Sequence, residues 1–179
     1  MSLEIVLGPM FSGKSTYALS YIRRQRAIGK LVKVIKPNID NRYGNEELIV
    51  THNRESIPCE LWPVQKPLCE MTDLWRYDCF VIEEAQFLKE LHHFCSHVLL
   101  ELKKDILVVG LDGDAKQAKF GEIMDVIPLA TSVTKLSALC HVCRNGTPAY
   151  YTKRYNGEQN AQVDVGGDEK YIAVCLNHL

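Results

Sequence analysis

The stretch Gly8-Pro9-Met10-Phe11-Ser12-Gly13-Lys14-Ser15 matches the phosphate-loop pattern G-x-x-x-x-G-K-[ST] at every position. Residues 3–7 before it, apolar except for Glu4, predict a buried strand, and residues 15–28 after it are typical of a helix. Glycines allow the loop to turn its N–H groups toward phosphate oxygens, and the helix N-terminus adds partial positive charge. The stretch therefore predicts a nucleoside triphosphate site, with Lys14 on the phosphates and the Ser15 hydroxyl on Mg²⁺. The alternative is a glycine-rich turn that binds nothing.

Composition is that of an ordinary globular protein. The 179 residues are enough for one core domain with a small appendage, and 46% of them are apolar and 24% charged. The net charge of −1 argues against a broad nucleic-acid footprint. For that reason we expect no nucleic acid as a partner. No apolar run approaches the roughly 20 residues that span a bilayer, so we expect no membrane as a partner either. Seven cysteines, an odd number, fit a reducing, cytoplasmic compartment, and we expect no signal peptide.

The apolar runs after the first helix predict a parallel sheet. Residues 31–35 follow the helix as a second strand, which gives a strand–helix–strand unit and hence parallel pairing. Residues 79–82 and 106–111 are apolar throughout, as in strands that are buried on both faces. The predicted fold class is α/β, a parallel sheet flanked by helices. Shorter strands are expected at 48–51 and 59–62, and helices at 67–75 and 88–103.

Two carboxylates, Glu83 and Glu84, follow the buried strand 79–82. A strand that delivers acids beside a phosphate loop is the Walker-B arrangement, in which one acid serves the metal and the next can act as a base. The alternative is a helix N-terminus with acids that suit its dipole. Asp40 and Arg42 follow the strand 31–35 at the same edge of the sheet, where α/β proteins bind ligands. Their segment also fits a simple polar turn.

The C-terminal part contains two pairs of metal-ligand residues. Cys140 and Cys143 form a C-x-x-C knuckle, and Cys175 and His178 form a C-x-x-H knuckle. Two such pairs predict a closed Cys₃His zinc site, which is structural because no position is left open for substrate. A redox C-x-x-C pair and ordinary buried cysteines are the alternatives.

We therefore divide the chain into a phosphate-loop domain, residues 1–135, and a zinc-ribbon subdomain, residues 136–179. Strands are expected at 149–154 and 170–174 of the subdomain, with a long loop, 157–169, between them. The zinc site would hold the ends of this loop together, and a loop held in this way often serves as a lid over a site.

In this order the motifs resemble one family over nearly the whole chain, the small thymidine kinases of the cellular type. The motifs that carry the resemblance are GPMFSGKST at 8–16, DNRY at 40–43, EEAQF at 83–87, LDG at 111–113, FG at 120–121, YTKR at 151–154, VGG at 165–167, KY at 170–171 and the four zinc ligands. The resemblance implies transfer of the γ-phosphoryl group of ATP to the 5′-hydroxyl of thymidine, which gives dTMP for DNA synthesis. It also implies feedback inhibition by thymidine triphosphate and assembly into homotetramers, or else dimers.

The resemblance also implies roles for individual residues. Glu84 matches the base that takes the hydroxyl proton, and Ser15, Glu83 and Asp40 match the residues near Mg²⁺. The loop 163–167 matches a "lasso" that closes over the base. The residues that match the ATP and phosphate site are Gly8, Pro9, Met10, Phe11, Ser12, Gly13, Lys14, Ser15, Thr16, Asp40, Arg42, Glu83 and Gln86. Those that match the thymidine site are Met10, Phe87, Leu111, Ala115, Phe120, Thr152, Val163, Asp164, Val165, Gly166, Gly167 and Tyr171.

Three residues depart from the family pattern. Glu83 stands in place of the usual Asp and lengthens the metal-binding arm by one methylene, and Ala85 replaces the usual Gly. Ala115 stands where the family has an aromatic ring against the base, so weaker thymidine binding is expected.

Two functions from other classes compete with the kinase. A phosphate-loop ATPase that remodels nucleic acid predicts a basic face and a finger arginine, and the sequence indicates neither. A zinc-ribbon binding module with a decayed kinase site has only Ala115 in its favour, because Lys14, Ser15 and Glu84 are all present.

Overall fold

The computed structural model describes residues 1–38, 47–50, 55–156, 161–164 and 166–179. The predictions for Asp40, Arg42 and Val165 therefore lie outside the described residues. A six-stranded sheet with the order β5-β2-β6-β7-β1-β8 forms the centre of the fold, and every neighbouring pair in it is parallel. This confirms the predicted α/β class. Its strands are β1 (Leu3–Leu7), β2 (Val32–Pro37), β5 (Glu60–Trp62), β6 (Cys79–Ile82), β7 (Asp105–Gly110) and β8 (Ser132–Lys135).

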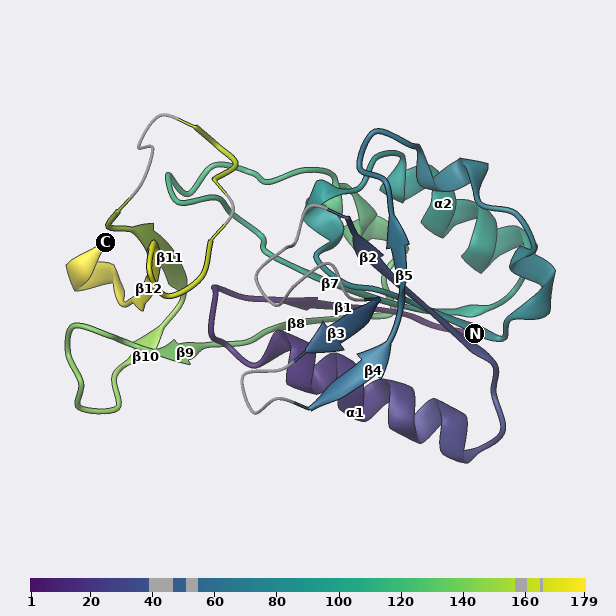
Figure 1. The fold of residues 1–179 in the computed structure, drawn as a ribbon, viewed down its shortest axis with the longest axis horizontal. Helices are drawn as coiled ribbons and strands as arrows, with labels where there is room; N and C mark the ends of the chain where they lie inside the picture. Colours follow the sequence, from purple (N-terminus) through teal and green to yellow (C-terminus); the bar gives the residue numbers. More distant parts are fainter. Residues whose placement is uncertain (39–46, 51–54, 157–160, 165) are drawn as a thin grey trace.

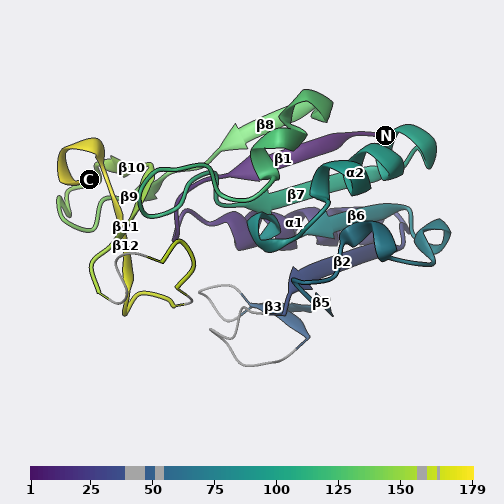
Figure 2. The same cartoon turned by 90° about the horizontal axis from the view of Figure 1, so that it is seen from above.

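Both faces of this sheet are covered, which is why its central strands are apolar throughout. Helix α1 (Lys14–Ala27) packs on one face, against a layer that includes Val81 and Val109. Helix α2 (Leu91–Ser96) packs on the other face, against the alternate side chains such as Phe80. Figures 1 and 2 show the two helices on opposite sides of the strands.

Two of the predicted helices were wrong in extent or type. In place of the helix predicted for 67–75, residues 68–76 form two 3₁₀ turns, because Asp73 between them has the left-handed conformation, with φ 59°. The helix predicted for 88–103 begins only at Leu91, after Glu90 with φ 57°, and ends as a π-helical turn. The 3₁₀ turns are Leu68–Glu70, Leu74–Arg76, Ala85–Phe87, Ile123–Leu129 and Leu176–His178, and the π turn is His97–Glu101.

The described residues also form three smaller antiparallel pairs. Strands β3 (Leu48–Val50) and β4 (Ser56–Pro58) pair beside the main sheet. The C-terminal region has the pair β9 (Ala138–Leu139) and β10 (Pro148–Ala149) and the pair β11 (Tyr151–Arg154) and β12 (Tyr171–Val174). This region encloses a small core of its own and lies at the end of the sheet where β1 leads into the phosphate loop (Figure 1).

Candidate functional site

The phosphate loop takes up a tight conformation at the carboxyl end of β1. Gly8, with φ 151°, has no room for a side chain, because a Cβ there would lie 2.7 Å from the carbonyl oxygen of Leu136. Gly13, with φ 85°, is the left-handed residue from which α1 starts. Inside the loop, the ammonium of Lys14 and the hydroxyl of Ser12 both donate to the carbonyl oxygen of Pro9, at 2.7 and 2.8 Å. The loop therefore holds its lysine inward at the start of a helix, where anions bind.

Two of the predicted magnesium ligands contact each other. The Ser15 hydroxyl at the start of α1 donates to Oε1 of Glu83, just after β6, at 2.5 Å. Glu83 is buried, with 4% of its surface exposed. A hydroxyl and a carboxylate oxygen at this distance suit a hard cation such as Mg²⁺, which takes one or two protein ligands beside the substrate phosphates.

Glu84, the predicted base, is held in place by Gln86. Its backbone is left-handed, with φ 49° and ψ 42°, a conformation that costs about 1–3 kcal/mol and is often found at active sites. The Gln86 amide nitrogen donates to Oε2 of Glu84 at 2.6 Å, and its oxygen accepts from the backbone N–H of Leu111 at 3.0 Å. Gln86, predicted near the phosphates, is thus buried with both ends of its amide bonded to protein, and it positions Glu84.

A cavity of about 550 Å³, part of it open to solvent, lies between the main sheet and the C-terminal region. Most of the residues predicted for the thymidine site line it, together with the predicted base; Gly167 does not. The predicted residues that line it are Met10, Glu84, Phe87, Leu111, Ala115, Phe120, Thr152, Val163, Asp164, Gly166 and Tyr171.

The walls of the cavity combine aromatic and polar contacts. Phe87 and Phe120 meet edge to face, with ring centroids 5.2 Å apart and an interplanar angle of 80°. On the opposite wall the Thr152 hydroxyl accepts a hydrogen bond from the backbone N–H of Met10 at 3.0 Å. This bond joins strand β11 directly to the phosphate loop.

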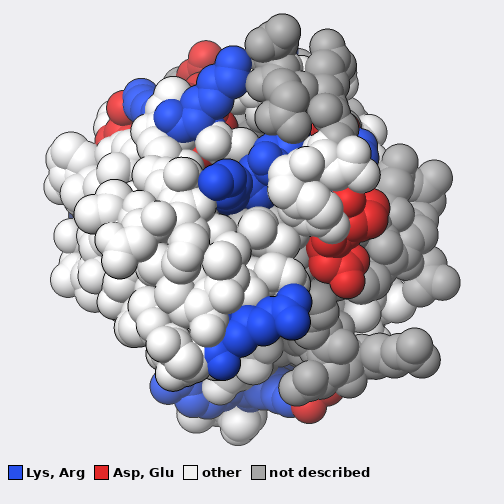
Figure 3. Space-filling model, turned by 90° about the vertical axis from the view of Figure 1, so that its left-hand side faces the viewer, with Lys and Arg blue, Asp and Glu red and all other residues white. Residues whose placement is uncertain are grey.

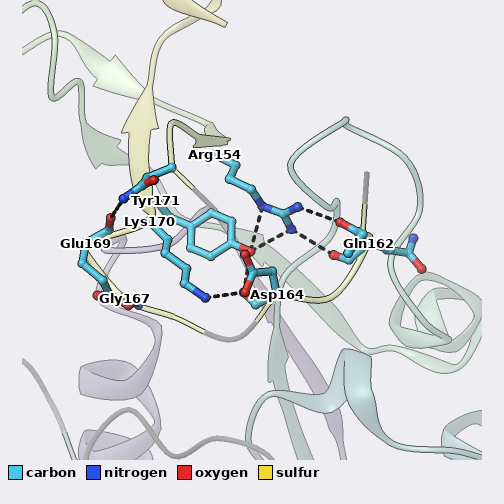
Figure 4. A network of polar contacts seen from close by, with 9 residues as sticks. Arg154, Gln162, Asp164, Gly167, Glu169, Lys170 and Tyr171 are labelled. Atoms are coloured by element: carbon cyan, nitrogen blue, oxygen red, sulfur yellow. Dashed lines mark hydrogen bonds and ion pairs between the residues drawn. The ribbon is translucent and has the colours of Figure 1, made fainter. Parts of the chain in front are cut away.

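Four further residues that line the cavity were not predicted: Gly113, Asp114, Arg154 and Gln162. Arg154 is the central residue of a network that Figure 4 shows. Its guanidinium donates to the Tyr171 hydroxyl through Nε at 3.1 Å and Nη2 at 2.8 Å. The Tyr171 hydroxyl in turn donates to the carbonyl oxygen of Asp164 at 2.6 Å. Arg154 is two residues after Thr152 on the same strand, so both side chains point to the same face of it, and both are buried. This spacing could have identified Arg154 as a residue of the site.

The loop between β11 and β12 also contains an ion pair. The Lys170 ammonium pairs with the Asp164 carboxylate, and Asp164 raises the pKa of Lys170. In the same loop the backbone N–H of Gly167 donates a hydrogen bond to the Glu169 carboxylate, and the nitrogen lies 2.8 Å from Oε1. Figure 4 shows the ion pair between Lys170 and Asp164 as a dashed line. The described part of the loop is therefore fixed by side chains as well as by the strands that flank it.

The four predicted zinc ligands converge on one point. Their ligand atoms all lie within 4.8 Å of one another. The Cys143 and Cys175 sulfurs are 3.7 Å apart, and His178 Nδ1 is 3.3 Å from the Cys175 sulfur and 3.7 Å from the Cys140 sulfur. Zn–S bonds of about 2.3 Å in a tetrahedron place sulfurs about 3.8 Å apart, so the cluster fits zinc.

The environment of this cluster also favours a metal. Burial raises the pKa of the Cys140 thiol, but backbone N–H groups of Cys143, Cys175 and Val142, together with the His178 side chain, have the larger effect and lower that pKa. A thiolate is the form that binds a metal.

Among the described residues, no helix is long and apolar enough to cross a membrane. All seven cysteines are free thiols. Figure 3 views the molecule from the end that carries the C-terminal region, and there the lysine and arginine side chains form several separate groups with uncharged surface between them and some acidic side chains nearby. This face therefore lacks a continuous basic band among its described residues.

Comparison with known proteins points to one family. A family model described as "Thymidine kinase" matches residues 1–179. "Thymidine kinase a" of Arabidopsis thaliana is 38% identical over 99% of this chain and 74% of that protein. "Thymidine kinase" of Oryza sativa subsp. japonica is 38% identical over 98% of this chain and 65% of that protein. "Thymidine kinase, cytosolic" of Homo sapiens is 35% identical, with 97% of this chain and 70% of that protein covered.

Proposed function

The chain belongs to the thymidine kinase family, and we propose that it transfers the γ-phosphoryl group of ATP to the 5′-hydroxyl of thymidine, which gives dTMP. One observation carries this proposal. Glu84 lines the same cavity as Met10 of the phosphate loop and Tyr171 of the C-terminal region. A nucleoside in this cavity would present its hydroxyl to a carboxylate next to the phosphate loop.

The residues in place suit phosphoryl transfer, which depends on positioning and on neutralising charge. Lys14 and the loop N–H groups would neutralise the phosphates, and Glu84 would accept the proton of the attacking hydroxyl. Gln86 donates a hydrogen bond to the Glu84 carboxylate, and this bond would keep the carboxylate in one orientation toward the substrate. The loop 161–164 and Gly166 would exclude water from the reacting groups.

Two metal ions complete the proposal. Ser15 and Glu83 would hold Mg²⁺, with Asp40 as a further ligand, and the ion would neutralise charge on the β- and γ-phosphates. Zn²⁺ on Cys140, Cys143, Cys175 and His178 would fold the C-terminal region, without a part in the reaction.

The wider assignments are supported more indirectly. We propose residues 1–135 and 136–179 as the two structural units, because the last strand of the main sheet ends at Lys135 and a separate core follows. We also propose a cytoplasmic protein that forms a homotetramer, or a dimer, and is inhibited by thymidine triphosphate. Free thiols and relatives named cytosolic support the location, and family resemblance supports the rest.

The test of the function is ATP-dependent phosphorylation of thymidine and deoxycytidine, measured side by side. We expect dTMP as the main product and no product from Lys14→Ala, because that change removes the cation of the phosphate loop. Phosphorylation of deoxycytidine in preference to thymidine, or ATP hydrolysis that needs nucleic acid and no nucleoside, would overturn the proposal.

Ala115→Phe is expected to tighten thymidine binding. Ala115 lines the cavity, in the segment between Leu111 and Phe120, and a ring there can stack on the pyrimidine. Base–aromatic stacking is worth roughly 1–3 kcal/mol, so Kd should fall about tenfold to a hundredfold. Calorimetric titration measures this, and ATP affinity serves as the internal control because Lys14 is untouched. Equal thymidine affinity of the two proteins would mean that Phe120 or Tyr171 already covers the base.

A further inference from the structure

Gln162 is held from two sides of the cavity. Its backbone carbonyl accepts from Arg154 Nη2 at 3.5 Å, and the carbonyl of Ala161 accepts from Nη1 at 2.7 Å. The Gln162 side-chain nitrogen donates to Asp114 Oδ2 at 2.9 Å and to the carbonyl of Lys119 at 3.4 Å. Arg154 belongs to β11, whereas Asp114 and Lys119 belong to the segment after β7. One residue of the loop therefore connects the C-terminal region to the main sheet domain across the cavity.

The side chain of Asp114 is held in a fixed position for this contact. It is buried, with 6% of its surface exposed, although it carries a carboxylate. Oδ1 accepts from the backbone N–H groups of Lys116 and Ala118, at 2.8 and 3.0 Å. These bonds fix the carboxylate, and its Oδ2 accepts from Gln162. Because the acceptor is charged, this hydrogen bond is stronger than one between neutral groups.

We propose that the hydrogen bond from Gln162 to Asp114 is a latch that holds residues 161–164 over the substrate, and that Gln162 is a positioning residue for thymidine. The identity of the ligand rests on the proposed function. Val163 and Asp164, the next residues of the loop, line the cavity, so the latch fixes part of the surface that the nucleoside contacts. When the latch is broken, the loop loses its side-chain link to Asp114. Its backbone keeps the hydrogen bonds from Arg154 on the β11 side.

Gln162→Glu tests the latch, because it places a second carboxylate against Asp114 at nearly constant size. We expect KM for thymidine to rise about tenfold, the value of one charge-assisted hydrogen bond. The kcat should stay within about twofold, and KM for ATP should not change, because Lys14 and Glu84 are not touched. Gln65→Glu makes the same chemical change at an exposed position outside the cavity and should match the parent.

A double variant separates the latch from a general loss of packing. In Asp114→Asn with Gln162→Glu, the donor and the acceptor are exchanged: the asparagine nitrogen can donate to the new carboxylate, and its oxygen still accepts from Lys116 and Ala118. We expect this protein to recover a KM for thymidine within about threefold of the parent. An unchanged KM in Gln162→Glu, or a double variant that is no better than the single one, would overturn the latch.

A measurement without substrate keeps this result separate from the kinase assay. The hydrogen bond from Gln162 to Asp114 joins two protein side chains and needs no nucleoside to form, so Gln162→Glu should accelerate hydrogen exchange about tenfold in peptides that cover 161–164, and Gln65→Glu should not. Equal exchange in Gln162→Glu and the parent overturns the latch, whichever nucleoside the enzyme phosphorylates. Failure of the parent to phosphorylate thymidine, with accelerated exchange in Gln162→Glu, would overturn the proposed function and leave the latch standing.

Discussion

Glu84→Gln is expected to lower the kcat of thymidine phosphorylation by about 10²–10⁴-fold, the usual effect of losing a positioned base. The substitution keeps the shape of the side chain, and the new amide oxygen can still accept from Gln86, which now bonds Glu84 at 2.6 Å. What it removes is the ability to take a proton. ATP affinity should remain nearly unchanged, because the phosphate loop and the Ser15–Glu83 contact are left intact.

Steady-state kinetics with thymidine, together with calorimetric titration of ATP, would measure this effect. Glu70→Gln is the matched control, because it makes the same change at an exposed residue of a 3₁₀ turn. If Glu84→Gln turns over within threefold of the parent, Glu84 is not the base. A loss of ATP binding in parallel with kcat would instead show that the variant disturbs the phosphate site.

Cys140→Ser should remove zinc and unfold the C-terminal region, with loss of thymidine binding. Zinc binding to small structural sites releases about 10–16 kcal/mol, and in domains of this size it is folding free energy. The hydrophobic cluster of the region is small among the described residues, so the metal should supply much of its folding free energy. The cavity should then lose its β11 and β12 wall, whereas the sheet domain, with its two large cores, should stay folded.

Elemental analysis, thermal unfolding and thymidine titration would test this prediction. Freshly purified parent protein should contain one zinc ion per chain. Cys69→Ser is the control, because Cys69 is an exposed free cysteine away from the cluster. A parent protein without zinc would contradict the prediction, as would a Cys140→Ser protein that melts at the same temperature as the parent and binds thymidine equally well.

Much of the fold could be predicted because its strands are buried on both faces. Runs such as Phe80-Val81-Ile82 are apolar without interruption, and the motifs at their ends mark the edge where ligands bind. Strand β8 (Ser132–Lys135) was missed because every residue in it is exposed and only pairing with β1 defines it. The helix predicted over 67–75 failed at Asp73, whose left-handed backbone carries no clear signal in the sequence.

The site divides in a similar way. Residues within local motifs, such as Met10, Glu84 and Thr152, could be placed by pattern and family resemblance, and the structure brings them to one cavity. Asp114 and Gln162 could not, because their role depends on a hydrogen bond between residues 48 positions apart in the chain. Such a contact arises from tertiary packing, and neither residue stands out in its own segment.

The position of β1 in the sheet has a consequence for folding kinetics. Both of its neighbours come much later in the chain, since Leu3 pairs with Ile106 and Glu4 with Ser132. Contacts over such sequence distances give a high contact order, which slows folding. At about 5–20 residues per second, translation needs roughly 5–20 s to reach β7 after β1 has been made. Throughout that interval the strand that leads into the phosphate loop has neither of its partner strands.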